Sequence, residues 1–409
     1  MNVLVIIADC ITRNSSANLC HLAYIRGLIN AGHKVTLISS DGRDYDVDKT
    51  MCIPKEVDTY FYYAVSCYEK LSLKKKNLNR NTVVNKDDTK LVSFKTNWTK
   101  KIIRKFKNCL ISFYGPHGIY AKFVKIAQKF KSDEIYDYVL SISEPPASHL
   151  LAYKLIKSKN IKYKHWIQIW EDPWYADIYG INNNKKVFEE ERKLLSYAEN
   201  VCYVSPLTLI NQQKLFPENS HKMYWQPLPF YYSESNIKND FIENVYGYFG
   251  DYAPITRNLT PFYNAAKEMN INVNICGNPN NLFESTDTIH IYPRLTLDKL
   301  KMIEEKTNIL IFLCNKKGGQ IPGKIYQYSS TTKTILFILD GTVEEKKVLR
   351  EFFEPYNRYI FCENTVEDIK KAIAKIQSND LNDVKNISIA DFNPDIIIDR
   401  ILKCGDLDD

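Results

Sequence analysis

The sequence predicts an α/β protein of two domains, each built on a parallel sheet. Its 409 residues exceed what one compact hydrophobic core normally supports. In both halves, short apolar runs alternate with segments whose apolar residues recur at helical spacing, a pattern that favours parallel sheets. A polar stretch at 232–240 separates the halves. We therefore expect an N-terminal domain at 1–232, a C-terminal domain at 241–390, and a terminal helix at 391–409 that packs back on the first domain.

The first domain should begin with a β-α-β unit. Residues 2–8 form an apolar run, 15–31 have helical spacing, and 34–39 are rich in β-branched residues. The loop between the first strand and helix would then face the carboxyl edge of the sheet, where α/β proteins bind ligands. The same alternation predicts further strands at 136–143, 164–170 and 200–204, with helices at 146–158 and 187–197.

Residues 45–115 interrupt this alternation with sequence rich in Tyr, Lys and Asn, and we interpret them as an insertion. Cations and apolar residues interleave from Trp98 to Phe106, which predicts an amphipathic helix near 98–110. Such a helix could make a peripheral contact with acidic membrane lipids, or it could be a solvated surface helix. No recognised nucleic-acid-binding motif accompanies the basic residues, so we expect no nucleic-acid partner.

The second domain shows the same alternation of strands and helices. A new strand begins at 245–250, directly after the polar stretch, and the tail at 394–402 is apolar at helical spacing. The remaining strands are expected at 272–276, 288–292, 309–314, 334–339 and 358–361.

The composition excludes several classes of protein. With 44% hydrophobic and 25% charged residues, the chain resembles a soluble globular protein and not a disordered one. Its ten cysteines form no C-x-x-C pair and no Cys/His cluster suited to zinc, so we expect buried, reduced thiols. No acidic cluster in the second domain resembles a D-x-D metal site at a strand end, and we expect neither a metal nor a cofactor. The N-terminus lacks the basic region of a signal peptide, and no apolar run reaches the roughly 18 residues of a membrane span. We expect a cytoplasmic protein, at most at the inner face of the membrane.

The segment Asn315–Tyr328 is the strongest candidate for an anion site. Gly318, Gly319 and Gly323 would let backbone N–H groups approach an anion closely. Lys324 adds a cation at a predicted helix N-terminus, where the helix dipole favours negative charge. A diphosphate would suit this place. A glycine-rich turn with a solvated lysine is the alternative.

The stretch Ile321-Pro-Gly-Lys-Ile-Tyr-Gln-Tyr328, followed by Lys333-Thr-Ile-Leu336, resembles the donor-binding segment of retaining GT-B glycosyltransferases that build bacterial surface polysaccharides. The resemblance implies two Rossmann-like domains facing each other across a cleft, with a nucleotide-diphosphate sugar, a UDP-sugar as first choice, on the second domain. Gln327 stands where the family typically has a Glu that binds the donor's ribose, and an amide can still form such a hydrogen bond. Gly319 stands where many relatives have a Glu near the sugar.

Arg257 is a second phosphate candidate. The strand Val245-Tyr-Gly-Tyr-Phe-Gly250 and the Arg257 that follows are similar to the opening of the family's donor domain, where a basic residue meets the diphosphate. The planar fork of an arginine can hold two phosphate oxygens, although a surface cation after a turn is the alternative. The resemblance and the glycine pattern together give the expected donor-binding set: Gly250, Arg257, Gly277, Gly318, Gly319, Ile321, Pro322, Gly323, Lys324 and Gln327.

The catalytic candidates come from the first domain. Ser141-Ile-Ser-Glu-Pro-Pro-Ala-Ser-His-Leu150 and Trp170-Glu-Asp-Pro-Trp174 resemble strand-end segments of polysaccharide-building members, so we expect both at the interdomain cleft. Glu171 or Asp172 could accept the proton of an acceptor hydroxyl, and His149 could orient the acceptor or a phosphate. Helix capping, packing or salt-bridging are the alternative roles.

Three residues are candidates for the acceptor side. Trp174 could stack on a sugar ring, although tryptophans more often anchor a core. Ser15 and Ser16 lie in a loop similar in position to the family's acceptor loop, and either could instead cap the following helix.

Together these features predict a hexosyl- or N-acetylhexosaminyltransferase that needs no metal. It would move a sugar from a nucleotide-diphosphate donor to a glycan or lipid-linked acceptor in surface-polysaccharide synthesis. Because of Gln327 and Gly319, the alternative is a catalytically weak partner subunit that binds glycan or stabilises an active transferase. A nucleotide-sugar epimerase of similar build is a third hypothesis.

Overall fold

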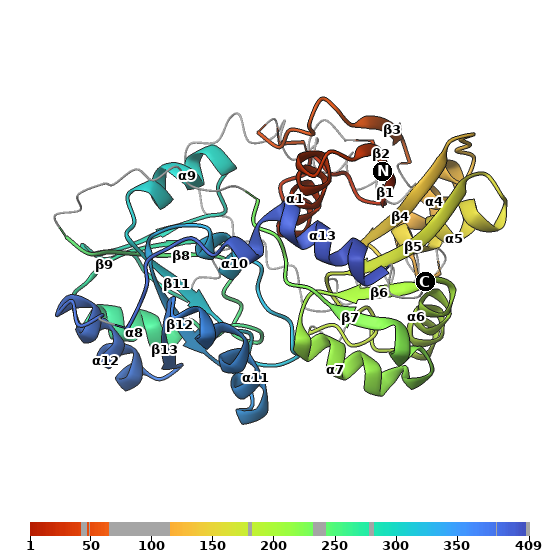
Figure 1. Cartoon of the computed structure of the whole chain (residues 1–409). Coiled ribbons are helices and arrows are strands. Elements are labelled where there is room, and N and C mark those ends of the chain that lie inside the picture. Colours follow the sequence, from red (N-terminus) through yellow and green to blue (C-terminus); the bar gives the residue numbers. More distant parts are fainter. Residues whose placement is uncertain are drawn as a thin grey trace, which may run out of the picture.

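A computed structural model describes residues 1–41, 47–48, 50–64, 115–178, 182–231, 243–277, 282–381 and 383–405. The predicted basic helix near 98–110 and the polar stretch at 232–240 lie outside these ranges. Figure 1 shows the two α/β halves side by side, with the last helix beside the first one.

The first half is a seven-stranded parallel sheet in the order β3-β2-β1-β4-β5-β6-β7. Its strands are β1 (Asn2–Ile7), β2 (Lys34–Ser40), β3 (Asp58–Tyr62), β4 (Ile135–Ser143), β5 (Lys162–Trp170), β6 (Asn200–Tyr203) and β7 (Met223–Trp225). Its helices are α1 (Ser16–Asn30), η1 (Gly118–Tyr120), α4 (Ala121–Ala127), α5 (Ala147–Lys157), α6 (Lys185–Tyr197), α7 (Pro206–Leu215) and η2 (Pro217–Lys222).

The second half is a six-stranded parallel sheet in the order β10-β9-β8-β11-β12-β13. Its strands are β8 (Val245–Phe249), β9 (Asn272–Cys276), β10 (Ile289–Tyr292), β11 (Ile309–Leu313), β12 (Thr334–Leu339) and β13 (Tyr359–Glu363). Its helices are α8 (Thr260–Glu268), α9 (Leu297–Glu305), α10 (Lys324–Ser329), α11 (Val343–Phe353), η3 (Glu354–Tyr356) and α12 (Val366–Gln377), and the tail adds η4 (Ala390–Phe392) and α13 (Pro394–Gly405). The predicted fold class, two Rossmann-like α/β domains, is confirmed.

Two strands differ from the sequence-based expectation. β3 lies inside the segment interpreted as an insertion, where it extends the sheet beside β2. Most of its side chains are exposed, and it has aromatic residues in place of the buried aliphatic run that marks most other strands. β7 has only three residues, which is too short for a periodic pattern.

Alternating side chains of the strands supply cores on both faces of each sheet. On β1, Val3, Val5 and Ile7 join a cluster that also contains residues of α1 and α13, while Leu4 and Ile6 face α4 and α5. The first of these clusters continues into the second half, because it also contains buried residues of β11, α10 and β12. One apolar core therefore joins the two domains.

The tail that follows the second half returns to the first. The N–H of Phe230, near the end of the first half, donates to the carbonyl of Phe392 in this tail over 3.1 Å. Further along the tail, α13 packs along α1. Gly27 of α1 permits this contact, since a Cβ there would lie 2.3 Å from the carbonyl oxygen of Pro394.

Candidate functional site

Carboxylates gather at the carboxyl edge of the first sheet. Asp9 follows β1, Glu144 follows β4, and Glu171 and Asp172 follow β5. Parallel strands end at one edge, which brings these side chains together although they are far apart in sequence. Asp177, later in the loop after β5, adds a further negative charge that Glu144 and Asp172 both sense.

The loop after β1 is shaped by hydrogen bonds to its own backbone. Ser15 caps α1, because its Oγ accepts the N–H of Asn18 over 3.2 Å. The amide of Asn18 donates to the carbonyls of Cys10 and Arg13 over 2.9 and 3.0 Å. Arg13 in turn pairs with the carboxylate of Asp9. Ser15 therefore has the helix-capping role, and Ser16 is the first residue of α1.

Burial and mutual repulsion raise the pKa values of three acids at this edge, Glu144, Glu171 and Asp172. Burial first, and then the charges of Asp172 and Glu171, raise the pKa of Glu144 to about 8. Burial also raises the pKa of Glu171, although the nearby imidazole of His21 opposes the shift. The pKa of Asp172 is raised by burial too, against the hydrogen bond from Gln320 and the charge of Arg257.

Asp172 is the member of this group that meets the second domain. Its carboxylate accepts a hydrogen bond from the side-chain amide of Gln320, which lies in the loop after β11. Arg257, from the loop after β8, also acts on Asp172 electrostatically. The guanidinium of Arg257 donates to Asn315 Oδ1 over 2.8 Å and to the carbonyl of Asp251 over 3.3 Å. The carboxyl edges of the two sheets thus face each other at Asp172.

The predicted phosphate loop packs against the first domain. Gly318 and Gly319 both have positive φ, at 97° and 73°. A Cβ on Gly318 would lie 2.4 Å from Cγ2 of Ile178, and one on Gly319 would lie 2.9 Å from Cβ of Leu207. The carbonyl of Gly319 accepts the hydroxyl of Ser205, the N-cap of α7, over 2.6 Å. These glycines permit close approach, and in this structure they approach protein atoms.

Lys324 begins α10, which has only six residues and so offers a weak helix dipole. Its ammonium group lies 2.8 Å from Oε1 of Glu304, which is almost fully buried. Gly323 precedes it as the N-cap, and Pro322 leads into that turn. Ile321 is buried in the shared core.

Gln327 contacts the end of the first domain. Its Oε1 accepts the backbone N–H of Tyr231 over 3.0 Å, and its Nε2 lies 3.3 Å from Ser330 Oγ. The predicted ribose-binding side chain thus holds the segment that leaves the first domain.

Gly250 and Gly277 lie at adjacent strand ends of the second sheet. A Cβ on Gly277 would lie 2.2 Å from the carbonyl oxygen of Gly250, so this contact requires a glycine. A Cβ on Gly250 would be 3.7 Å from the guanidinium of Arg257. Gly250, Gly277 and Arg257 therefore form one edge of the site on the second domain.

Two residues expected at the cleft are buried in the first-domain core instead. His149 is fully buried, with Nδ1 2.8 Å from Ser141 Oγ and its ring centroid 4.3 Å from that of Trp170, the two rings being tilted by 32°. Burial and the neighbouring His117 hold the pKa of His149 well below its usual value. Trp174 is 5% exposed, and its backbone N–H donates to Glu191. Their observed positions match the packing alternatives.

Asp9, Arg13, His21 and Glu144 belong to this site and are not among the residues predicted from the sequence. Glu144 stands inside the strand-end segment that the sequence analysis singled out, and Asp9 directly follows an apolar strand. The position directly after a strand was thus the useful signal. His21 gives no such signal, because it lies within a helix.

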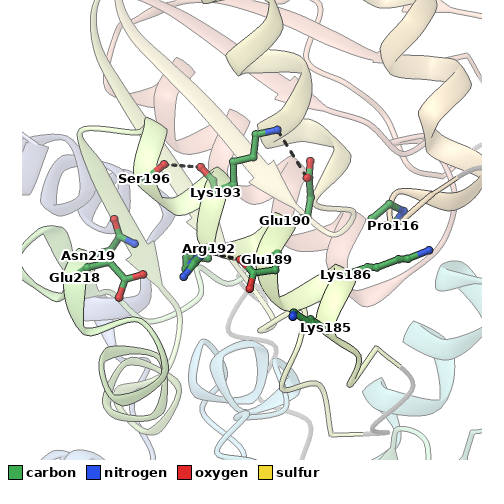
Figure 2. A pocket seen from close by; sticks show the side chains of 10 residues that line it. All are labelled: Pro116, Lys185, Lys186, Glu189, Glu190, Arg192, Lys193, Ser196, Glu218 and Asn219. Atoms are coloured by element: carbon green, nitrogen blue, oxygen red, sulfur yellow. Dashed lines mark hydrogen bonds and ion pairs between the residues drawn. The ribbon is translucent and has the colours of Figure 1, made fainter.

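Two hollows lie in the described part of the surface, and neither is lined by the carboxylates at the edge of the first sheet. A hollow of about 920 Å³ lies along α6 and is lined by charged side chains such as Lys186, Glu190 and Lys193, which Figure 2 shows. A much smaller one lies where Leu207 of the first half meets residues of the second half, among them Gly319, Gln320 and Pro322. Within the described ranges, no Cys, His, Asp and Glu side chains form a group suited to a metal ion. No described helix is long and apolar enough to cross a membrane.

The fold and the facing strand edges define the class: a GT-B arrangement of two Rossmann-like domains. No protein family and no curated protein matches the sequence. Solved structures match along the whole chain. Sucrose-phosphate synthase from Thermosynechococcus elongatus is 11% identical, with a TM-score of 0.56 over 99% of this chain and 97% of that one.

Two further structures have the same architecture. A glycosyltransferase from Rickettsia africae is 11% identical, with a TM-score of 0.53 over 99% of this chain and 98% of that one. The UDP-GlcNAc 2-epimerase from Neisseria meningitidis, bound to UDP-GlcNAc, is 12% identical, with a TM-score of 0.50 over 100% of both chains. At such identities the likeness establishes the fold alone.

Proposed function

We propose that this protein is a glycosyltransferase that moves a sugar from a nucleotide-diphosphate donor to a hydroxyl of an acceptor. The observation that carries the proposal is the meeting of the two strand edges at Asp172, with acids on the first domain and Arg257 on the second. The same fold serves transferases and a protein bound to UDP-GlcNAc, which supports a UDP-sugar as the donor. Fold likeness alone leaves the chemistry to the site.

Arg257 is the cation that we assign to the donor's diphosphate. Within the described residues its guanidinium donates to an amide oxygen and a carbonyl and forms no ion pair at contact distance, so it can still bind an anion. Gly250 and Gly277 would let the diphosphate approach the backbone beside it. Lys324 would contribute only after exchanging Glu304 for a phosphate oxygen.

The acids of the first domain would act on the acceptor. Glu171 or Asp172 would accept the proton of the attacking hydroxyl, and Arg257 would stabilise the charge of the departing diphosphate. In this structure Asp172 is bonded to Gln320, so an acceptor would have to replace that bond or the domains would have to part. We propose a glycan or lipid-linked acceptor in surface-polysaccharide synthesis, used at the cytoplasmic face of the membrane.

The first test is binding of UDP and UDP-sugars, measured as a shift in the melting temperature. A nucleotide at about 100 times its Kd stabilises by about 2.7 kcal/mol, which is readily measured. Arg257→Ala should abolish the shift, while Arg192→Ala, at an exposed ion pair on α6, should keep it. Product analysis with acceptor mixtures then tests transfer. No shift with any common nucleotide sugar would refute the proposal.

A catalytically weak partner subunit is the second candidate. It is favoured by the contacts of Gln327 with Tyr231 and of Lys324 with Glu304, because both side chains expected at the donor are bonded to protein. In that case the chain binds a glycan or another transferase and shows no turnover. Release of UDP by the purified chain in the presence of an acceptor excludes this candidate, and isomerised UDP-sugar without acceptor would indicate an epimerase.

A further inference from the structure

His21 lies below the carboxyl edge of the first sheet, on α1, and none of its surface is exposed. Its Nε2 faces the end of β4 and the loop after β5. Its Nε2 is 3.3 Å from the carbonyl oxygen of Ser143 and 3.4 Å from Oε1 of Glu171. Its Nδ1 is 3.2 Å from Oδ1 of Asn18. The protonation of this ring follows from what those partners can accept or donate.

The side chain of Asn18 can have only one orientation. Its amide nitrogen lies 2.9 Å from the carbonyl of Cys10, 3.0 Å from that of Arg13 and 3.3 Å from a carboxylate oxygen of Asp9. All of these are acceptors, so the NH2 group must face them. The amide oxygen therefore faces His21, and Nδ1 of the imidazole must donate to it.

The other ring nitrogen also faces acceptors. A carbonyl oxygen cannot donate, so Nε2 needs a hydrogen to bond Ser143. A neutral imidazole has a single N–H, whereas both nitrogens of this ring face carbonyl or amide acceptors. The charge has a partner, because Nε2 lies 3.4 Å from Oε1 of Glu171, a buried oxygen that accepts from no other donor among the described residues.

We propose that His21 is a positioning residue, a buried imidazolium held by Asn18 and Ser143 that keeps the carboxylate of Glu171 ionised and fixed at the first-domain edge. The proposal concerns the charge state of these two groups. That Glu171 then serves as the base in sugar transfer rests on the proposed function.

The surrounding groups agree with this charge state. Burial acts to lower the pKa of His21, but the charge and hydrogen bond of Glu171 outweigh it, so that the pKa is raised. Asp9 also favours the imidazolium, and Asp172 repels the charge of Glu171. Cys20 and Tyr24 stay neutral beside the pair, because burial and Glu171 raise both of their pKa values.

The pair gives the two glutamates at this edge different protonation states. Burial raises the pKa values of both, but His21 opposes the rise at Glu171, whereas burial and then the neighbouring carboxylates raise the pKa of Glu144 to about 8. With the proposed imidazolium in place, Glu171 is the proton acceptor of the two near neutral pH and Glu144 the proton donor. Neighbouring carboxyl groups with separated pKa values are the usual source of an acid and a base in one site.

The decisive experiment is nitrogen-15 NMR of the imidazole rings in the full-length protein, without any substrate. Both nitrogens of His21 should be protonated from pH 6 to pH 8, and His21→Gln should remove that signal and so assign it. His149 is the matched control, because it is equally buried and its pKa is lowered, so its ring should be neutral. An unprotonated nitrogen on His21 at pH 7 would overturn the proposal.

A double-mutant cycle tests the pairing. Removing one partner of a buried ion pair should lower the melting temperature by roughly 10 °C, so His21→Gln and Glu171→Gln should each be costly. The double variant should be no less stable than His21→Gln, because it leaves no unpaired charge. Additive losses would refute the pairing.

The same variants separate this proposal from the proposed function. If transfer is found, His21→Gln should move the acidic limb of the kcat/KM profile to higher pH by about one unit or more, since Glu171 loses its cation. An unchanged limb would refute the role of Glu171 as the base. If no transfer is found while both nitrogens of His21 are protonated, the proposed function fails and the charge state stands.

Discussion

Gly318→Ala should disrupt the contact between the domains. An alanine there must adopt φ 97°, which costs about 1–2 kcal/mol for a residue with a Cβ. Its Cβ would also lie 2.4 Å from Cγ2 of Ile178, over 1 Å inside the usual separation of carbon atoms. Relieving such overpacking typically costs another 1–3 kcal/mol, or about 2–5 kcal/mol in total.

Gly32→Ala is the matched control. Gly32 has a similar φ of 79°, and a Cβ there would meet nothing within 4 Å, so that variant carries the backbone strain alone. At roughly 2–4 °C per kcal/mol for a domain of this size, Gly318→Ala should melt roughly 2–12 °C below Gly32→Ala. Small-angle X-ray scattering should also show a larger radius of gyration for Gly318→Ala, because the loop can no longer lie against Ile178.

A second background isolates the clash. In Ile178→Ala the methyl group is gone, so adding Gly318→Ala should cost only the backbone strain measured at Gly32. The reasoning is refuted if Gly318→Ala and Gly32→Ala lose equal stability, or if the cost of Gly318→Ala is the same with and without Ile178.

The remaining predictions concern buried charges. Glu144 has its pKa raised from 4.5 to about 8, so its contribution to stability is lost as pH rises across that interval. The free energy of unfolding of Glu144→Gln, measured in urea, should gain on that of the wild type by roughly 2 kcal/mol or more between pH 5 and pH 8. A pH-independent difference would contradict this. The side chain of Arg358 is fully buried and donates to the carbonyls of Thr331 and Ile387. Arg358→Lys should lower the free energy of unfolding by about 3 kcal/mol, and a loss below about 1 kcal/mol would contradict this.

Much of the fold follows from local pattern. β9 and β12 begin and end at the residues expected from their apolar runs, because buried parallel strands need continuous apolar sequence. β3 could not be predicted in this way. It is an edge strand with exposed side chains, and its pairing with β2 is the contact that defines it.

The site was less predictable, because it depends on contacts distant in sequence. The glycines at 318 and 319 indicated close approach, but only the fold shows that Ile178 and Leu207 are what they approach. His149 was expected at the strand edge, yet the face of α5 on which it lies points into the core, where its ring contacts Ser141. Ser143 and Glu171 are far from His21 in sequence, and only the packing of α1 against the ends of β4 and β5 brings them to it.

The way the tail returns to the first domain constrains how the halves can part. A single connection would allow them to twist and bend in any direction. Here Phe230 is bonded to Phe392 and α13 is anchored on α1, so the end of the chain ties the second domain to the first at further points. Any parting of the edges that meet at Asp172 must therefore preserve these contacts or break them.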